Sequence, residues 1–107
     1  MANMNYSVFV VKIIKNPEQS FFKDGTSVTE FPVQLSQIRK NNIEIILQVS
    51  AWGKLGYDIM DYYKINDYII IEGYISLRTN NYDDFSSLLN KQVEISVSKI
   101  YPLFLKK

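Results

Sequence analysis

The chain has 107 residues and a net charge of +1, from 12 basic and 11 acidic side chains, and it contains neither cysteine nor histidine. This length predicts a single domain spanning residues 1–107, and the composition excludes disulfides, thiolate metal sites and the usual zinc and acid–base chemistry. No apolar run is long enough to span a membrane, and the N-terminus lacks a signal-peptide pattern. We therefore expect a soluble intracellular protein with no catalytic site, no metal, no cofactor and no membrane partner.

Strands are predicted along most of the chain, because β-branched and aromatic residues alternate with polar ones. The first predicted strand, residues 6–15, is instead apolar on both faces, with Tyr6, Val8 and Val10 on one and Phe9, Val11 and Ile13 on the other. A strand with this pattern is covered on both sides. Asn16-Pro17 ends it, Phe21-Phe22 begins a short continuation, and residues 23–26 form an Asp-Gly turn.

Two further strands are predicted at residues 27–37 and 43–52, joined by a polar turn. In the first of them, Phe31, Val33 and Leu35 share one face. In the second, one face carries Ile43, Ile45, Leu47, Val49 and Ala51, and the other carries Glu44, Ile46, Gln48, Ser50 and Trp52. Because Trp52 shares its face with polar residues, we expect its ring to be exposed.

One helix is predicted at residues 53–63, where Leu55, Ile59, Tyr62 and Tyr63 form an apolar stripe that faces the core. A fourth strand follows at residues 68–78, and Gly73 within it predicts a bulge or a sharp bend. After a polar loop, the fifth strand at residues 92–101 alternates apolar and polar side chains. The order β-β-β-α-β-β, all-β with one helix, predicts the five-stranded β-barrel of the OB-fold.

Short motifs surround the predicted helix at fixed spacing. They are Trp52-Gly53-Lys54-Leu55 before it, Tyr62-Tyr63-Lys64-Ile65-Asn66-Asp67 after it, and then Glu72-Gly73 and Leu77-Arg78-Thr79. This series resembles the single-stranded DNA-binding protein (SSB) family, in particular its short plastid-encoded members from red algae. The resemblance implies DNA binding without sequence specificity in replication or repair, through base stacking on aromatic rings and phosphate contacts from basic side chains.

The resemblance also implies which residues contact the strand. Trp52 and Tyr82 match stacking positions of the family, whereas a third such position is occupied by Ile46. The expected nucleic-acid contacts are Trp52, Tyr82, Arg39, Lys40, Lys54, Arg78, Ile46 and Gln48. The nearly neutral net charge, and the two aspartates that follow Tyr82, count against extensive phosphate contact.

Assembly and location follow from the same resemblance. SSB-like proteins associate through the first strand, which implies a homodimer or homotetramer. The expected interface residues are Tyr6, Val8, Phe9, Val10 and Val11. Frequent residues with A/T-rich codons, together with the resemblance to plastid-encoded proteins, predict a plastid location, with a bacterial cytoplasm as the alternative.

The residues leave two functions open. The first is a binding protein for single-stranded DNA, or RNA. The second is a repurposed OB-fold whose Trp52 and Ile46 face holds a protein partner in a larger complex, or a dimer like the primosomal replication protein, with weak or no DNA binding. An enzyme is not expected, since the chain has no histidine, cysteine or glycine-rich phosphate loop and no convincing carboxylate pair.

Overall fold

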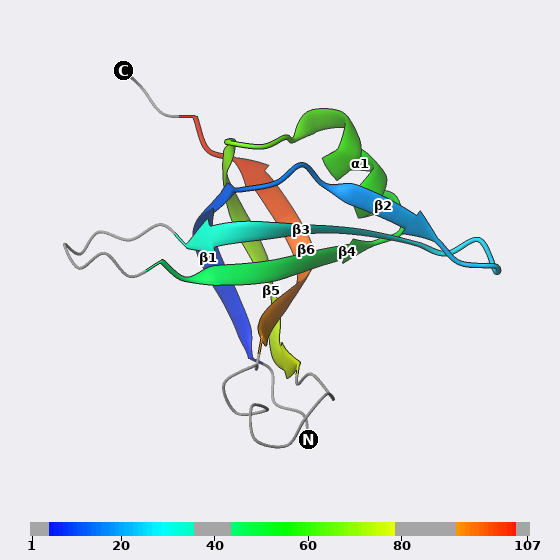
Figure 1. The fold of residues 1–107 in the computed structure, drawn as a ribbon, viewed down its shortest axis with the longest axis horizontal. Helices are drawn as coiled ribbons and strands as arrows, with labels where there is room; N and C mark the ends of the chain where they lie inside the picture. Colours follow the sequence, from blue (N-terminus) through cyan, green and yellow to red (C-terminus); the bar gives the residue numbers. More distant parts are fainter. Residues whose placement is uncertain (1–4, 36–43, 79–91, 105–107) are drawn as a thin grey trace.

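A computed structural model describes residues 5–35, 44–78 and 92–104 of the chain. Its elements are β1 (Tyr6–Ile13), β2 (Glu18–Phe21), β3 (Ser27–Leu35), β4 (Ile46–Trp52), α1 (Lys54–Tyr62), β5 (Tyr68–Arg78) and β6 (Gln92–Pro102). Strands β1, β5, β6, β4 and β3 follow one another around a closed barrel, because β1 pairs with both β5 and β3 (Figure 1). The pairings are antiparallel except that of β4 with β6. The predicted OB-fold barrel with one helix is confirmed.

A hairpin of β2 and β3 extends beyond the barrel (Figure 1). The sequence predicts that the chain resumes a strand at Phe21-Phe22, and this is wrong: pairing begins at Glu18, and Phe22 lies in the turn after β2. The physical reason is that β2 is an edge strand outside the core. Its first three residues are polar, so the sequence carries no alternating apolar signal there.

One face of β1 lies inside the barrel and the other lies outside. Val11 is fully buried, and Phe9 packs against the core from the same face. Tyr6, Val8 and Val10 are exposed on the outer face. The side chains of Phe9 and Val11 therefore face the interior of the closed barrel, so of the expected interface residues only Tyr6, Val8 and Val10 present their side chains to a partner, and the interface itself stays a prediction.

Apolar side chains from all five barrel strands and from α1 form the core. The buried cluster consists of Val11, Ile13, Phe31, Val33, Leu47, Val49, Ala51, Ile59, Ile69, Ile71, Ile95 and Val97. The alternation predicted for β3, for β4 from Leu47 to Trp52, and for β6 is confirmed by this set. It leaves the opposite face of β4 outside the barrel.

The pairing of β5 with β6 shifts at Gly73, as the sequence predicts. Glu72 pairs with Lys99 but Gly73 pairs with Val97, so Ser98 is an extra residue on β6. A Cβ atom on Gly73 would collide with the backbone carbonyl of Ser96. Glycine is therefore required here by the close approach of the two strands where the barrel bends.

The helix α1 packs across β3 and β4 through Gly56 and Ile59, which are buried. A Cβ atom on Gly56 would collide with the hydroxyl oxygen of Thr29 and would lie 3.2 Å from the carbonyl oxygen of Ala51. Glycine therefore lets the helix lie close against the sheet. Among the described residues, no helix is long and apolar enough to cross a membrane.

Tyr62 does not face the core, and the predicted helical stripe is wrong at this residue. Its side chain is 75% exposed, whereas Leu55 and Tyr63 pack against the core as predicted. The close contact at Gly56 centres the buried stripe on Gly56 and Ile59. Tyr62 then falls at the edge of the stripe, in the last position of the helix.

Replacing Gly73 with alanine is expected to destabilise the protein by roughly 1–3 kcal/mol or more, because the new methyl group meets backbone that has little room to move. Thermal unfolding followed by circular dichroism measures the effect, at about 4–8 °C per kcal/mol for a domain near this size. Ser76→Ala, at an exposed position of the same strand, is the matched control. Equal unfolding midpoints for the two variants would contradict the close approach.

Candidate nucleic-acid interface

The outer face of β4, opposite the core, carries the side chains that the sequence singles out. We call Ile46, Gln48, Ser50 and Trp52 the outer face of β4. Trp52 is 51% exposed, as predicted, and Ile46 is also exposed. Trp52 is six positions after Ile46 along the strand, which is about 20 Å, and partly buried Gln48 and Ser50 lie between them. The structure therefore places Trp52 and Ile46 on one face but not in one site.

Phe22 stacks on the indole of Trp52. The two ring centroids are 5.8 Å apart and the ring planes differ by 13°. The turn after β2 holds Phe22, whose N–H donates to the Thr26 carbonyl at 2.8 Å and whose own carbonyl accepts from the Gly25 N–H at 2.9 Å. Phe22 thus packs against the indole from one side, and about half of the surface of Trp52 remains exposed to solvent.

The predicted Asp-Gly turn is present and closes this hairpin. The Asp24 Oδ1 atom accepts a hydrogen bond from the Thr26 N–H at 3.0 Å. Hydrogen bonding from Thr26 to the charged carboxylate lowers the pKa of Asp24 below its ordinary value. Asp24 is therefore ionised at neutral pH and contributes to the turn in that form.

A second ring contact lies on the other side of the same hairpin. The rings of Phe21 and Tyr57 have centroids 6.4 Å apart, inclined at 40°. Phe21 is 60% exposed, and Tyr57 on α1 is also exposed. We call Phe21, Phe22, Trp52 and Tyr57 the hairpin aromatic cluster. The sequence does contain a signal for it: adjacent residues of a strand point to opposite faces, so two successive phenylalanines cannot both be buried by one core.

Charged side chains divide this region into a basic end and an acidic centre. Lys23 in the hairpin turn and Lys54 at the start of α1 are exposed near the aromatic cluster. Glu18 and Glu30 pair directly across β2 and β3. They line a shallow depression of about 370 Å³ together with Lys15, Asn16, Phe31, Pro32 and Gln48. Asp24 follows Lys23 in the turn, so the two lysines leave the aromatic end only a small basic excess. In the depression, Glu18 and Glu30 outnumber Lys15 and disfavour phosphate.

Only part of the expected contact set can be placed. Trp52 and Lys54 lie together at the junction of β4 and α1. Arg78 ends β5, but its side chain is outside the described part of the molecule, and Arg39, Lys40 and Tyr82 also lie outside the described residues.

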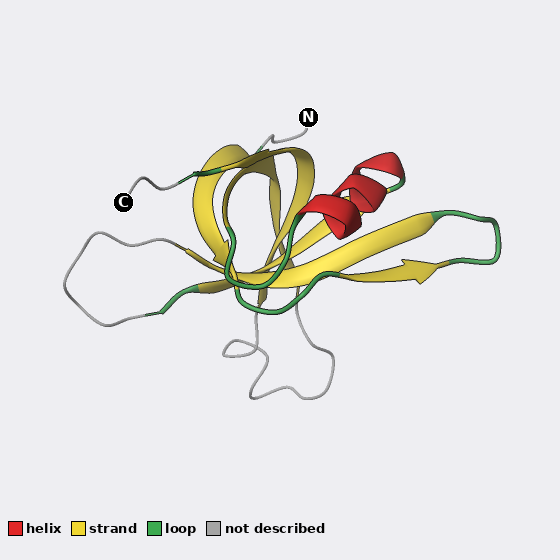
Figure 2. Ribbon diagram, turned by 90° about the horizontal axis from the view of Figure 1, so that it is seen from above, coloured by secondary structure: helices red, strands yellow, loops and turns green. Residues whose placement is uncertain are grey.

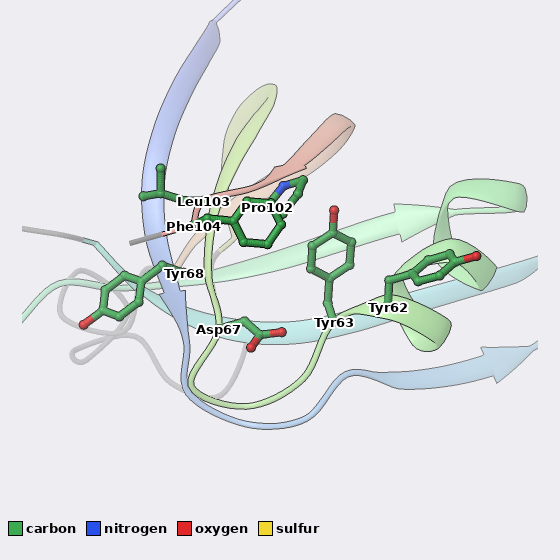
Figure 3. A pocket seen from close by; sticks show the side chains of 7 residues that line it. All are labelled: Tyr62, Tyr63, Asp67, Tyr68, Pro102, Leu103 and Phe104. Atoms are coloured by element: carbon green, nitrogen blue, oxygen red, sulfur yellow. The ribbon is translucent and has the colours of Figure 1, made fainter. Parts of the chain in front are cut away.

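A second pocket of similar volume lies at the opposite end of α1, a helix about 13 Å long. It has a volume of about 380 Å³ and is lined by Tyr62, Tyr63, Asp67, Tyr68, Pro102, Leu103 and Phe104 (Figure 3). Burial, and then the charges of Asp67 and Asp58, raise the pKa of Tyr63. Asp67 also accepts a hydrogen bond from the Lys64 N–H at 3.0 Å, which stabilises the turn. The carboxylate of Asp67 repels phosphate, so this pocket does not belong to the candidate interface.

Comparison with known proteins decides the family. The Single-strand binding protein family matches residues 4–103, almost the entire chain. The chain belongs to this family. The half-exposed Trp52 and its stacked partner Phe22 are therefore features of a member of this family.

Two related sequences and one structure extend this result. The chain is 50% identical over 103 residues to ycf41 of Trieres chinensis, provisionally named a single-stranded DNA-binding protein, covering 95% of this chain and 91% of that protein. It is 32% identical over 98 residues to a thylakoid-associated single-stranded DNA-binding protein, slr1034, of Synechocystis sp., covering 91% and 74%. The fold matches a small single-stranded DNA-binding protein of Streptomyces coelicolor with a TM-score of 0.80 at 14% identity, covering 94% and 95%.

Phe22→Leu is expected to shift the fluorescence of Trp52 to longer wavelength in the absence of any ligand, because loss of the stacked ring exposes more of the indole to water. Trp52 is the only tryptophan of the chain, so its emission spectrum reports the surroundings of this one indole. Phe21→Leu is the matched control, since its ring contacts Tyr57 instead. Identical spectra for Phe22→Leu and the unmodified protein would show that the rings do not stack in solution.

Proposed function

We propose that the protein binds single-stranded DNA with little sequence preference, and that a base stacks on the exposed half of Trp52. The observation that carries this proposal is the half-exposed indole held against Phe22 in a member of the Single-strand binding protein family. The names of its relatives from Trieres chinensis and Synechocystis sp. support the same ligand. Every base has a π-face, so stacking on a ring tolerates any sequence.

In this proposal the strand follows the basic end of the interface. A base adds to the open side of the Trp52 and Phe22 stack, which already fixes the plane of the indole. Lys23 and Lys54 then neutralise phosphates on either side of the rings. Glu18 and Glu30 repel the backbone of the nucleic acid from the depression that they line, so the contact is confined to the aromatic end.

A protein partner on the face shared by Trp52 and Ile46 gains no support from the geometry. The two side chains are about 20 Å apart along β4, with Gln48 and Ser50 between them. They do not form the contiguous apolar patch that marks a protein-binding surface. We accordingly infer a binding protein rather than a subunit repurposed for protein contact, and a non-enzymatic one, as its family name implies.

We infer a plastid location on two grounds. The composition is rich in residues with A/T-rich codons, as is usual for plastid genomes. A relative in the cyanobacterium Synechocystis is named as thylakoid-associated.

Trp52→Ala is expected to weaken binding of oligo-dT by about 1–3 kcal/mol, the usual contribution of one stacked base, which is about 5- to 150-fold. Fluorescence anisotropy of labelled oligo-dT measures both proteins. Tyr62→Ala, an exposed ring at the far end of α1, is the control and should bind as the unmodified protein does. Unmodified protein that binds no oligo-dT at low salt would overturn the proposed function.

Lys54→Gln is expected to make binding less sensitive to salt. Each phosphate contact on a single strand contributes about −0.7 to the slope of log Kobs against log salt concentration, so the slope should become shallower by about that amount. Lys64→Gln is the matched control, because Lys64 is exposed just beyond the other end of α1. A slope unchanged by Lys54→Gln would exclude this lysine as a phosphate contact.

We further propose that two copies associate through β1. Tyr6, Val8 and Val10 form an exposed row on its outer face, and Tyr6 packs edge-on against Tyr74 with centroids 4.9 Å apart. Within the described ranges, β3 pairs with β1 only at residues 11–13, whereas β5 pairs with residues 6–12. One edge of residues 6–10 is thus open to a strand from a second copy.

Val8→Asp is expected to convert the assembly to a monomer, because it places a charge in the middle of this apolar row. Light scattering coupled to size-exclusion chromatography measures the mass. Met60→Asp, at an exposed apolar residue of α1, is the control and should leave the mass unchanged. An unmodified protein that is monomeric at all concentrations would refute association through β1.

A further inference from the structure

The β2–β3 hairpin presents aromatic rings on both of its faces, and the proposed stacking on Trp52 uses only one of them. Phe22 lies against Trp52 on the outer side. Phe21, the preceding residue, lies against Tyr57 of α1 on the other side. Successive Cα atoms are only about 3.8 Å apart, so the two ring pairs lie close together on opposite sides of the same stretch of backbone.

The surroundings of the hairpin leave a path between the two pairs. β2 is the last strand of the sheet order and pairs only with β3 within the described residues. Figures 1 and 2 both show α1 beside the hairpin, and in Figure 1 the helix lies on the side of β2 that faces away from β3. No described strand pairs with the free edge of β2, and the rings of Phe21 and Tyr57 are exposed beside it.

We propose that a single strand of DNA turns around the free edge of β2, stacking first on Trp52 beside Phe22 and then on Phe21 beside Tyr57. This inference rests on the proposed function, and it assigns Phe21 and Tyr57 as a second stacking site. The four exposed rings of the hairpin aromatic cluster form an apolar surface, and such a surface is typical of a binding site. Nucleic-acid bases fit this surface, because they can stack on the rings on both faces of the hairpin whatever the base sequence.

Charge sets the limits of this path. Lys23 follows Phe22 directly in the turn and is exposed, which places a cation beside the first ring pair, while the ionised Asp24 that comes next repels phosphate from the tip of the turn. Asp58 and Asp61 are exposed further along α1 and repel phosphate from the rest of the helix. The second site therefore ends at Tyr57 and does not extend to Tyr62.

The test measures affinity as a function of oligonucleotide length. Oligo-dT is varied in single steps over about 4 to 16 nucleotides, the range of site sizes for one OB-fold, and quenching of Trp52 reports binding at the first site. Phe21→Leu and Tyr57→Leu each remove a ring of the second site while keeping an apolar side chain. Tyr62→Leu is the matched control, an exposed tyrosine on the same helix.

The expected result depends on length. With the shortest oligonucleotides, Phe21→Leu and Tyr57→Leu bind as the unmodified protein does, because only the first site is occupied. With longer ones, each variant binds about fivefold or more weakly, the loss of at least one stacking contact. Tyr62→Leu matches the unmodified protein at every length.

Three outcomes would overturn the inference. Unchanged affinity of both variants at every length, while Trp52→Ala remains weakened, would remove the second site and leave the proposed function intact. Equal weakening at all lengths would show that the substitutions act through the Trp52 and Phe22 stack. An absence of Trp52 quenching and of any anisotropy change with the unmodified protein would instead defeat the proposed function itself.

Discussion

Burial of Leu47, Val49 and Ala51 inside the barrel fixes the direction of every other side chain on β4. The side-chain period of a strand is two, so a slip of one residue would expose all three. Losing the burial of the leucine and the valine alone would cost about 1.5–3 kcal/mol each. Because a shifted register would cost this much free energy, the indole of Trp52 stays outside the barrel, at the point where β4 ends and α1 begins. The candidate interface is thus a direct consequence of core packing.

The same packing orders the rings around Trp52. Because Gly56 allows α1 to lie close to β3 and β4, Tyr57, the next residue, reaches the hairpin and contacts Phe21. On the other side, the stack of Phe22 on Trp52 contributes about 0.5–1.5 kcal/mol beyond the area it buries. Rings that are held in one orientation before a ligand arrives lose little conformational entropy on binding. One close backbone contact, at Gly56, and one stacked ring pair therefore prepare the aromatic surface that we propose for DNA.

How far the sequence predicts this molecule depends on whether a side chain faces the core. Barrel strands are predictable because burial of one face imposes alternation, and Gly73 is predictable because a strand interior disfavours glycine unless two backbones approach. β2 has no apolar face, so the alternation of apolar and polar residues does not predict where this strand begins and ends. Tyr62 fits a helical stripe, and only the close contact at Gly56 shows that the buried face is turned away from it. Trp52 was predictable as an outward ring, but its partner Phe22 is 30 residues distant and depends on the hairpin register.

Net charge alone is a poor guide to this interface, because opposite charges lie in different places. The nearly neutral total argues against an extended track of phosphate contacts. Lys23 and Lys54 nevertheless lie at the aromatic end, while Glu18 and Glu30 pair across the edge strands β2 and β3. A short contact of this kind depends more on stacking than on phosphate neutralisation, and its affinity per copy is limited. Association of two copies through β1 would present two such contacts to one strand, and the second contact then forms at a high effective concentration. Assembly would thus supply the affinity that the charge of a single chain does not.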